Sequence, residues 1–285
     1  ATLSAFRAGI FNVGVEGSLD VGAFAAAWIG FTFTSWPGIL LPLAAFGAAG
    51  LVGALWAWLP GYLKARLRVD EVVTTIMLNY VAILFTTYLV TGPFLVPGMA
   101  NAMSLEVAPQ AQLARIVPRS QWNDSFWVAL LCFLVVFWLL RRGTLGYEIR
   151  AIGSNSLFAR WSGIPVGHVI IRVMLISGFI GGLAGAGQVL GVHYRFVAGF
   201  SRGLGFDGIV VALVGRNSPL GALLAALFLG ALRNGGSTME LFTRIPRDLI
   251  DIVQALIIFF LAVEISVSWL RSRWASSQTT LPKPE

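Results

Sequence analysis

The sequence predicts an all-α polytopic membrane protein with about 7–9 membrane segments, some of them broken or short half-helices. Of its 285 residues, 57% are hydrophobic and only 12% are charged, whereas soluble domains carry about 25% charged residues. The mean hydropathy is +0.80. Most of the 32 glycines lie inside apolar segments, where membrane helices use them for close packing. This composition excludes a soluble domain and a disordered chain, and the single cysteine, Cys132, excludes a secreted disulfide scaffold.

The membrane segments follow from apolar runs, because a helix needs roughly 20 such residues to cross a bilayer core about 30 Å thick. An apolar stretch over 1–34 is interrupted by polar residues, and a turn follows at 35–38. Two pieces, 206–215 and 219–232, are too short for straight spans, so they either cross as a pair or re-enter as a pair. The uninterrupted spans are predicted at 39–59, 72–91, 124–140, 169–191 and 247–270.

The loops divide into two sets by their basic residues. Ten of the twenty Lys and Arg residues lie in 60–71, 141–168 and 271–285, and seven lie in the opposing segments 92–123, 191–205 and 233–247. Because basic loops stay on the cytoplasmic side, the first set is predicted inside. Residues 92–123 then form an extracytoplasmic loop. Residues 1–270 form a single transmembrane domain, and 271–285 a polar cytoplasmic tail.

The formal net charge of the chain is +7. On a soluble protein this charge would suggest a nucleic-acid partner. Here the basic residues fit loops that face the cytoplasm and anionic lipid. Membrane lipid is therefore an expected partner, and nucleic acid is not.

The first polar interruption is FNVGVEGSLD at 11–20. A continuous helix over 1–34 would be about 51 Å long, which overshoots the bilayer, and Gly14 and Gly17 favour a break. Glu16 would cost about 2.5–3.5 kcal/mol in lipid, so it should face protein or water. Two interpretations stay open. Asn12 and Glu16 line a translocation route, or the segment is an interfacial loop in which Glu16 is hydrated or caps a helix start.

A second polar stripe lies in DEVVTTIMLNY at 70–80. Asp70 and Glu71 suit the positive end of a helix dipole. Thr75 and Asn79 are four residues apart and share one helix face. Such a stripe lines a pore or forms hydrogen bonds between helices, and the second interpretation is the more common one.

The cytoplasmic segment 143–164 is polar and has helical potential. A short amphipathic helix here either rests on the membrane surface, which the residues slightly favour, or docks into a groove of a partner protein. The small residues Gly153, Ala159 and Gly163 permit a close approach in either case.

Three pairs of glycines, each four residues apart, lie in 178–191. This spacing predicts tight packing against neighbouring helices. A phosphate-binding loop does not fit, because the lysine and the following Ser or Thr of a P-loop are absent from this segment and from the rest of the chain.

Helix-breaking residues flank the short apolar piece 206–215, as GLGFDG at 203–208 and GRNSPLG at 215–221. This pattern predicts a half-helix of the kind that lies near transport pathways, with Asp207 and Asn217 as its polar candidates. The alternative is two short tilted spans joined by an ordinary turn.

Residues for enzyme chemistry are sparse. The two histidines, His168 and His193, fall on opposite sides of the predicted membrane, and one cysteine cannot form a metal cluster. We predict no catalytic residue, no metal site and no cofactor.

Five segments together resemble a known family. They resemble the permease subunits of bacterial ABC importers for nucleosides and simple sugars, a group that broadly includes ribose and branched-chain amino acid permeases. The segments are FNVGVEG (11–17), DEVVTTIMLNY (70–80), RAIGSN (150–155), GFDGIVVALVGRNSPLG (205–221) and IPRDLIDIVQALIIFFLAV (245–263).

The resemblance implies a multi-pass subunit of the bacterial inner (plasma) membrane, with a second permease subunit, cytoplasmic ATP-binding subunits and an extracytoplasmic substrate-binding protein as partners. It implies that 143–164 is the segment that couples to the ATPase. The implied coupling residues are Glu148, Arg150, Gly153, Asn155, Ala159 and Gly163. The implied residues of the translocation path are Asn12, Glu16, Thr75, Asn79, Asp207 and Asn217.

Members of this family usually carry one or more membrane segments before FNVGVEG, whereas 10 residues precede it here, which leaves the completeness of the N-terminus open.

Two hypotheses outside this family stay open. An ion-coupled secondary transporter of a small polar solute would need intramembrane ionisable groups, for which Glu16, Asp20 and Arg172 are the candidates. A non-transporting membrane scaffold is a third hypothesis.

Overall fold

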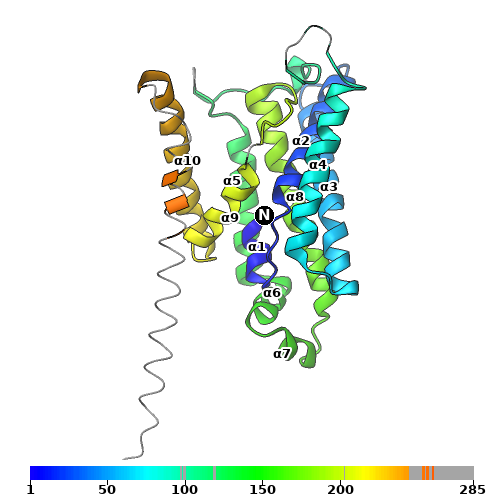
Figure 1. Cartoon of the computed structure of the whole chain (residues 1–285), viewed down its shortest axis with the longest axis vertical. Coiled ribbons are helices and arrows are strands. Elements are labelled where there is room, and N and C mark those ends of the chain that lie inside the picture. The colour runs from blue at the N-terminus through cyan, green and yellow to red at the C-terminus, as the bar shows by residue number, and fades with distance from the viewer. Residues whose placement is uncertain are drawn as a thin grey trace, which may run out of the picture. The chain divides into compact units, whose positions relative to one another are not determined.

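The structure is a computed structural model, shown in Figure 1. It describes residues 1–243, apart from 97, 99, 100, 118, 119 and 202, and also residues 252, 253, 255, 256 and 259. The chain divides into two compact units, Ala1–Ala212 and Leu213–Glu285, called here the first and the second unit.

The regular structure of the described residues is helical, with two isolated β-bridges, Met103 with Val197 and Arg115 with Asn123. A π-helical turn extends α3 over Leu63–Leu67, another extends α8 over Val189–His193, and a 3-10 turn covers Pro109–Ala111. The helices are α1 (Thr2–Arg7), α2 (Val15–Thr32), α3 (Leu40–Tyr62), α4 (Glu71–Thr91), α5 (Ser125–Arg142), α6 (Thr144–Ser154), α7 (Ser156–Trp161), α8 (Val166–Gln188), α9 (Leu204–Val214) and α10 (Pro219–Thr243).

These helices confirm the all-α polytopic class. The spans predicted at 39–59, 72–91, 124–140 and 169–191 correspond to α3, α4, α5 and α8. The predicted span 247–270 lies outside the described residues except at five positions, and the predicted tail 271–285 lies outside them entirely. In the described part of the chain, five helices are long and apolar enough to cross a membrane: Leu40–Leu67, Glu71–Thr91, Ser125–Arg142, Val166–His193 and Pro219–Gly236.

Two predicted boundaries are wrong. The piece 219–232 is not too short to cross, because α10 continues to Thr243 and has 25 residues. Each glycine in its polar second half costs about 1 kcal/mol relative to alanine, which is too little to end a helix. Gly17 is not part of a break, because it lies inside α2; the break occupies the residues between Arg7 and Val15.

Side-chain caps explain two of the helix starts. Asp70 accepts hydrogen bonds from the backbone amides of Val72 and Val73 at 2.9 and 3.1 Å and so caps α4. Asn155 accepts from the amides of Leu157 and Phe158, both at 3.0 Å, and so ends α6 and starts α7. The predicted polar segment 143–164 is therefore two short helices with a corner at Asn155.

The centre of the first unit is α8 packed against α2 and α3. The glycines of α8 face both neighbours: a side chain at Gly182 would overlap the Ala49 carbonyl of α3, and one at Gly185 would overlap the Leu19 carbonyl of α2. These contacts confirm the predicted packing role of the glycine pairs in 178–191. They also bring the three backbones closer than larger residues would allow.

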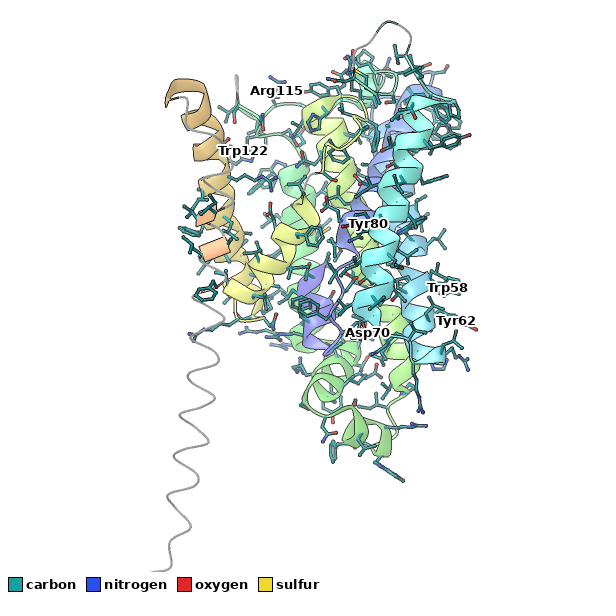
Figure 2. All side chains as sticks on the ribbon, in the orientation of Figure 1. Trp58, Tyr62, Asp70, Tyr80, Arg115 and Trp122 are labelled. Carbon is teal, nitrogen blue, oxygen red and sulfur yellow. The ribbon has the colours of Figure 1, made fainter. Side chains whose placement is uncertain are left out.

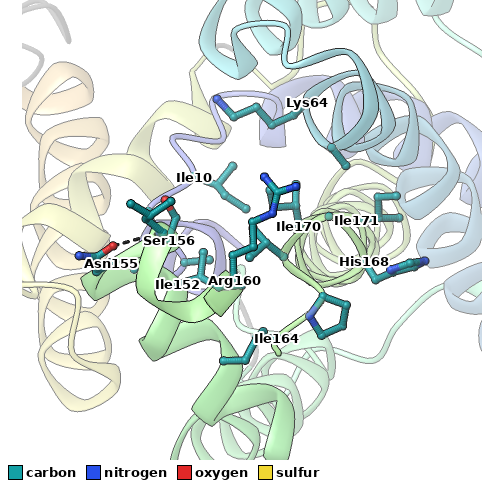
Figure 3. A pocket seen from close by; sticks show the side chains of 18 of the residues that line it. Ile10, Lys64, Ile152, Asn155, Ser156, Arg160, Ile164, His168, Ile170 and Ile171 are labelled. Carbon is teal, nitrogen blue, oxygen red and sulfur yellow. Dashed lines mark hydrogen bonds between the residues drawn. The ribbon is translucent and has the colours of Figure 1, made fainter. Parts of the chain in front are cut away.

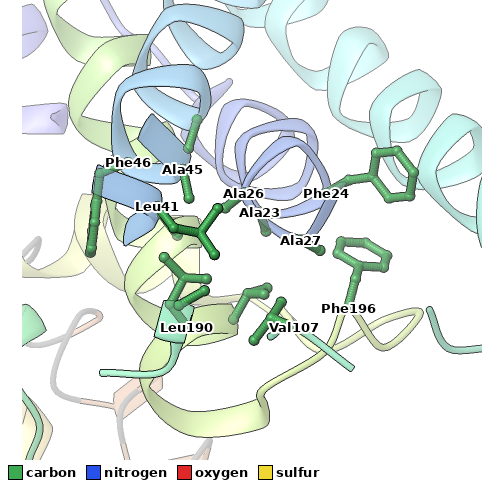
Figure 4. Packing of buried hydrophobic residues seen from close by; sticks show 14 of the residues in the cluster. Ala23, Phe24, Ala26, Ala27, Leu41, Ala45, Phe46, Val107, Leu190 and Phe196 are labelled. Carbon is green, nitrogen blue, oxygen red and sulfur yellow. The ribbon is translucent and has the colours of Figure 1, made fainter. Parts of the chain in front are cut away.

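One end of the first unit, called here the loop end, is closed by the segments 92–123 and 191–205. The amides of Ser104, Val107 and Leu113 donate to the carbonyls of Phe196, Tyr194 and Leu190, each at 2.9 Å. Figure 4 shows the apolar cluster beneath, in which Val107 and Phe196 lie against alanines of α2 and Leu41 of α3.

The opposite end, called here the basic end, collects 60–71 and 141–168. A second apolar cluster there joins α1, α5, α6, α7 and α8 through buried residues that include Ala5, Leu140, Ile149, Ala159 and Val173. Figure 2 shows Arg115 and Trp122 toward the loop end and Asp70 and Tyr62 toward the basic end. Two of the three loops in each predicted set thus gather at opposite ends of this unit, whereas 233–247 belongs to the second unit and 271–285 lies outside the described residues.

The surface of α4 is the inverse of a soluble helix. Its buried face carries Thr75, Asn79 and Thr86, and its exposed face carries large apolar residues such as Met77 and Leu84. A helix that hides its polar groups and exposes its apolar ones is suited to lipid surroundings.

Candidate functional site

The break between α1 and α2 is organised by Asn12, a buried residue. Its Oδ1 accepts from the Gly14 amide at 2.8 Å, next to the start of α2, and its Nδ2 donates to the Ser177 hydroxyl of α8 at 2.9 Å. One side chain therefore ends the extended segment and attaches it to the central helix. The sequence held no signal for Ser177.

Asn79 of α4 holds the other side of the break. Its Nδ2 donates to the Val13 carbonyl at 2.9 Å, and its Oδ1 accepts from the Gly17 amide at 2.8 Å. A side chain at Gly17 would lie 2.9 Å from that Oδ1, which explains why this position inside α2 is a glycine. Thr75 faces the same way, next to Gly14, and donates to the Glu71 carbonyl of its own helix at 2.6 Å. Asn79 thus forms the interhelical hydrogen bonds that the polar stripe favoured.

Glu16 joins α2 to the start of α9. Its Oε1 accepts from the Gly203 amide at 3.0 Å and its Oε2 from the Gly205 amide at 2.5 Å. The residue is 2% exposed. Glu16 therefore caps a helix start, as one interpretation of the sequence proposed, but the helix lies 187 to 189 positions away in the chain. The positive end of the α9 dipole suits this carboxylate.

Asp20 lies one turn beyond Glu16 on α2 and is also 2% exposed. A side-chain hydrogen bond joins it to Ser201, and its Oδ1 has no hydrogen-bond partner among the described residues. Asp20 belongs to the polar segment 11–20 and was predicted as an ionisable group of the ion-coupled alternative. Asp20 follows Glu16 by four residues, which places both carboxylates on one face of α2. This spacing could have indicated that both face the same segment, residues 201–205.

The last two path candidates are placed differently. Asp207 lies half-buried in the first turn of α9, where a carboxylate is favourable to the helix dipole. Asn217 belongs to the second unit and has a left-handed backbone (φ 52°) in the turn before α10. The structure thus brings Asn12, Glu16, Thr75 and Asn79 together around the break, with Asp207 on the helix that Glu16 caps.

The candidates for ATPase coupling differ in exposure. Arg150, Gly153, Asn155 and Gly163 are exposed, and Gly163 has a left-handed backbone (φ 83°) after α7. Glu148 is half-buried, and Arg150 donates to the Leu140 carbonyl. A side chain at Gly153 would meet the Arg7 carbonyl, and Ala159 is 0% exposed, so both residues contact neighbouring elements of the first unit.

The sequence missed the residues that α7 exposes. Leu157 and Phe158 are 64% and 65% exposed, and Trp161 is 84% exposed. They lie in the same six-residue helix as the buried Ala159, so α7 has one packed face and one apolar free face. Their spacing in the sequence could have predicted this, because it places the three large apolar side chains on the side of a helix that faces away from Ala159.

Among the described residues, no group of three or more His, Cys, Asp and Glu side chains is arranged to hold a metal ion. The buried polar groups are instead the amide side chains of Asn12 and Asn79 at the break before α2 and the Glu16 carboxylate at the start of α9. Long apolar helices surround them. This arrangement defines the class of polytopic membrane proteins with discontinuous helices, to which transport permeases belong.

The chain belongs to the family of the branched-chain amino acid transport system permease component, whose model matches residues 1–262. It is 40% identical to the guanosine ABC transporter permease protein NupP of Bacillus subtilis, over 96% of this chain and 79% of that protein. It is 36% identical to the glucose ABC transporter permease protein TsgB13 of Haloferax volcanii, over 90% and 70%. It is 32% identical to the nucleoside ABC transporter permease protein NupB of Lactococcus lactis, over 92% and 74%. No solved structure matches the chain.

These matches confirm the family that the sequence resembled. They support the ABC importer permease over the ion-coupled alternative, because the family is a transport permease component and the named relatives are ABC transporter permeases.

Proposed function

We propose that the chain is the subunit that forms the translocation path for a nucleoside or a simple sugar in an ABC importer of the bacterial inner membrane. The observation that carries the proposal is the buried Glu16 carboxylate, which joins the break before α2 to the start of α9. The similarity to permeases named for guanosine, nucleosides and glucose supports this substrate class.

The path runs along the buried polar residues Asn12, Glu16, Thr75 and Asn79 of the first unit, with Asp207 on α9. Asn217, in the second unit, is a further path candidate. Amide and carboxylate groups bind hydroxyl-rich neutral solutes well, because they offer several donors and acceptors to one ligand. In alternating access, the hydrogen bonds that now join α2, α4 and α9 exchange with hydrogen bonds to the solute.

The ATPase subunits bind at the basic end, which is cytoplasmic in this proposal. The free apolar face of α7, with Leu157, Phe158 and Trp161, contacts the ATPase, and the exposed residues Asn155 and Gly163 flank it. Ala159 and Gly153 transmit the motion inward, because they pack α7 and α6 against the core and against the Arg7 carbonyl next to the break. ATP hydrolysis takes place on these partner chains.

The substrate-binding protein docks at the loop end, which is extracytoplasmic in this proposal. The backbone hydrogen bonds between 92–123 and 191–205 give that docking surface a fixed shape. A second permease subunit completes the path. The paired names NupP and NupQ in Bacillus subtilis, at 40% and 27% identity to this chain, support a heterodimer. Residues 1–270 form one transmembrane domain, and 271–285 form its cytoplasmic tail.

Reconstituted uptake tests the proposal. The full chain is placed in proteoliposomes with its second permease and ATPase subunits and a binding protein, and uptake of labelled guanosine, other nucleosides and glucose is measured. We expect uptake that requires ATP and persists when ion gradients are collapsed. Uptake without ATPase subunits, or uptake that stops when the ion gradient is removed, would contradict it.

A further inference from the structure

A cavity of about 1190 Å³ opens at the basic end of the first unit (Figure 3). It lies between the π-helical turn after α3, the corner between α6 and α7, and the start of α8. Pockets of about 300–1,000 Å³ already hold small molecules, so the space is sufficient for a ligand. None of the proposed path residues lines it, so it is separate from the path, but Gly153, Asn155 and Leu157 of the proposed ATPase-coupling segment do line it.

Positive charge dominates the lining. Lys64, Arg66, Arg68 and Arg160 line the cavity, and no Asp or Glu does. Lys64 is neutralised by Glu71, with 2.5 Å between Nζ and Oε2. The three arginines form no ion pair within the part of the chain that the structure describes. In Figure 3 the Arg160 side chain extends from α7 toward the middle of the cavity. The site therefore favours an anion.

The start of α8 adds a second source of positive potential. This helix has 23 residues, and no side chain caps its N-terminus. Three residues of its first turn, Val166, Gly167 and His168, line the cavity. A long helix carries about half a positive charge at this end, where phosphate groups bind readily.

The rest of the lining combines the polar residues Ser154, Asn155 and Ser156 with a large apolar surface. Five isoleucines contribute to the wall: Ile10, Ile152, Ile164, Ile170 and Ile171. A small inorganic anion would leave this surface without a partner. An amphiphile with a phosphate head and a hydrocarbon body would contact both parts of the lining.

We propose that this cavity binds a phosphate group carried by an acidic phospholipid. Arg66, Arg68 and Arg160 contact the phosphate. A planar guanidinium group can donate two parallel hydrogen bonds to a phosphate and therefore binds it more strongly than an ammonium group does. The isoleucines contact the glycerol and the first acyl carbons. The bound lipid holds the corner between α6 and α7 against α8.

Native mass spectrometry of the purified full chain in neutral detergent tests the site. Phosphatidylglycerol, phosphatidylcholine and inorganic phosphate are titrated separately against the unmodified chain, the double variant Arg66→Gln/Arg160→Gln and the single variant Arg142→Gln. Arg142 is the matched control, because it is an exposed arginine near the same end and does not line the cavity. A thermal melt of each variant verifies that it folds.

We expect one phosphatidylglycerol to bind per chain in preference to phosphatidylcholine. The double variant should weaken this binding about 30-fold, because each basic residue near anionic lipid contributes roughly fivefold in affinity. Arg142→Gln should leave it unchanged. A different result is also informative: the chain binds inorganic phosphate but not phosphatidylglycerol, and the double variant loses the phosphate. The cavity would then be a phosphate site for a soluble ligand, and the lipid would be the wrong ligand.

Two results would overturn the proposal. The first is phosphatidylglycerol binding that the control variant weakens as much as the double variant, since that is general surface attraction. The second is displacement of the lipid by the ATPase subunit together with weaker ATPase binding by the double variant. The cavity would then be a protein-docking surface. Neither result depends on which solute is transported.

Discussion

The Glu16 carboxylate of α2 accepts a hydrogen bond from the Gly205 amide of α9, with 2.5 Å between Oε2 and the nitrogen. A second amide, that of Gly203, occupies the other carboxylate oxygen. Both oxygens of one buried acid are thus engaged at the start of a short helix, so this contact positions α9 more directly than any other polar contact described for its start.

We expect Glu16→Gln to lower the stability of the permease by about 1–3 kcal/mol, because the amide side chain keeps one acceptor oxygen and leaves one backbone amide without a partner. The loss is measured as a lower melting temperature in detergent. Glu106→Gln is the control: its ion pair with Arg195 is exposed, and its loss should cost only about 0–1 kcal/mol. Equal shifts in both variants would show that the Glu16 contact is not special.

Asn79→Ala should destabilise the chain by about 1–3 kcal/mol, because it leaves the Gly17 amide and the Val13 carbonyl unpaired inside the protein. Thr86→Ala is the matched control on the same face of α4, since the Thr86 hydroxyl donates only to carbonyls of its own helix. Melting curves of the two variants measure these losses of stability, and Asn79→Ala should lower the melting temperature more than Thr86→Ala. A larger effect of Thr86→Ala would contradict the assignment of Asn79 as the link between α2 and α4.

Gly182→Leu should prevent stable folding, because even the first side-chain carbon would overlap the Ala49 carbonyl of α3. The yield of monodisperse protein after detergent extraction is the measurement. Gly47→Ala provides the comparison: it is another helical glycine of this unit, with nothing within 4 Å of the added carbon, and it should be neutral or up to about 1 kcal/mol stabilising. A normal yield for Gly182→Leu would disprove the tight contact between α8 and α3.

Trp161→Ala should reduce the stimulation of the ATPase subunits by the permease at least several-fold, with little change in permease stability, because this side chain is 84% exposed. ATP hydrolysis by the reconstituted complex measures the effect. Trp36→Ala, in the turn between α2 and α3, is the comparison and should leave hydrolysis unchanged. Unaltered stimulation by Trp161→Ala would remove α7 from the ATPase interface.

The sequence predicted the spans because their signals are local. Asp70 marks the start of α4, and Arg141 and Arg142 mark the end of α5, through charges that lipid disfavours. The end of α10 was misjudged for the converse reason: polar residues after 232 lower the hydropathy without removing the backbone hydrogen bonds of the helix. The break before α2 was predicted, but Gly17 was wrongly counted as part of it. A glycine can mark either a break in a helix or a close contact with a neighbouring helix, and the sequence does not distinguish the two.

The partners of the site residues could not be predicted. Asn12 and Glu16 were identified as buried polar groups from their cost in lipid, whereas Ser177 and Gly205 are remote in the chain and have no local signal. Trp161 was missed because a tryptophan near a membrane surface fits lipid and protein partners equally well.

The contact of α8 with α2 and α3 has a mechanical consequence. Where backbone meets backbone at Gly182 and Gly185, there are few side-chain torsions that could rearrange to accommodate a shift. The three helices then behave as one stiff block, and the deformation that changes access has to concentrate at its edges, in the extended residues before α2 and in the segment that leads into α9. Such hinges would transmit force from outside the block without disturbing its interior.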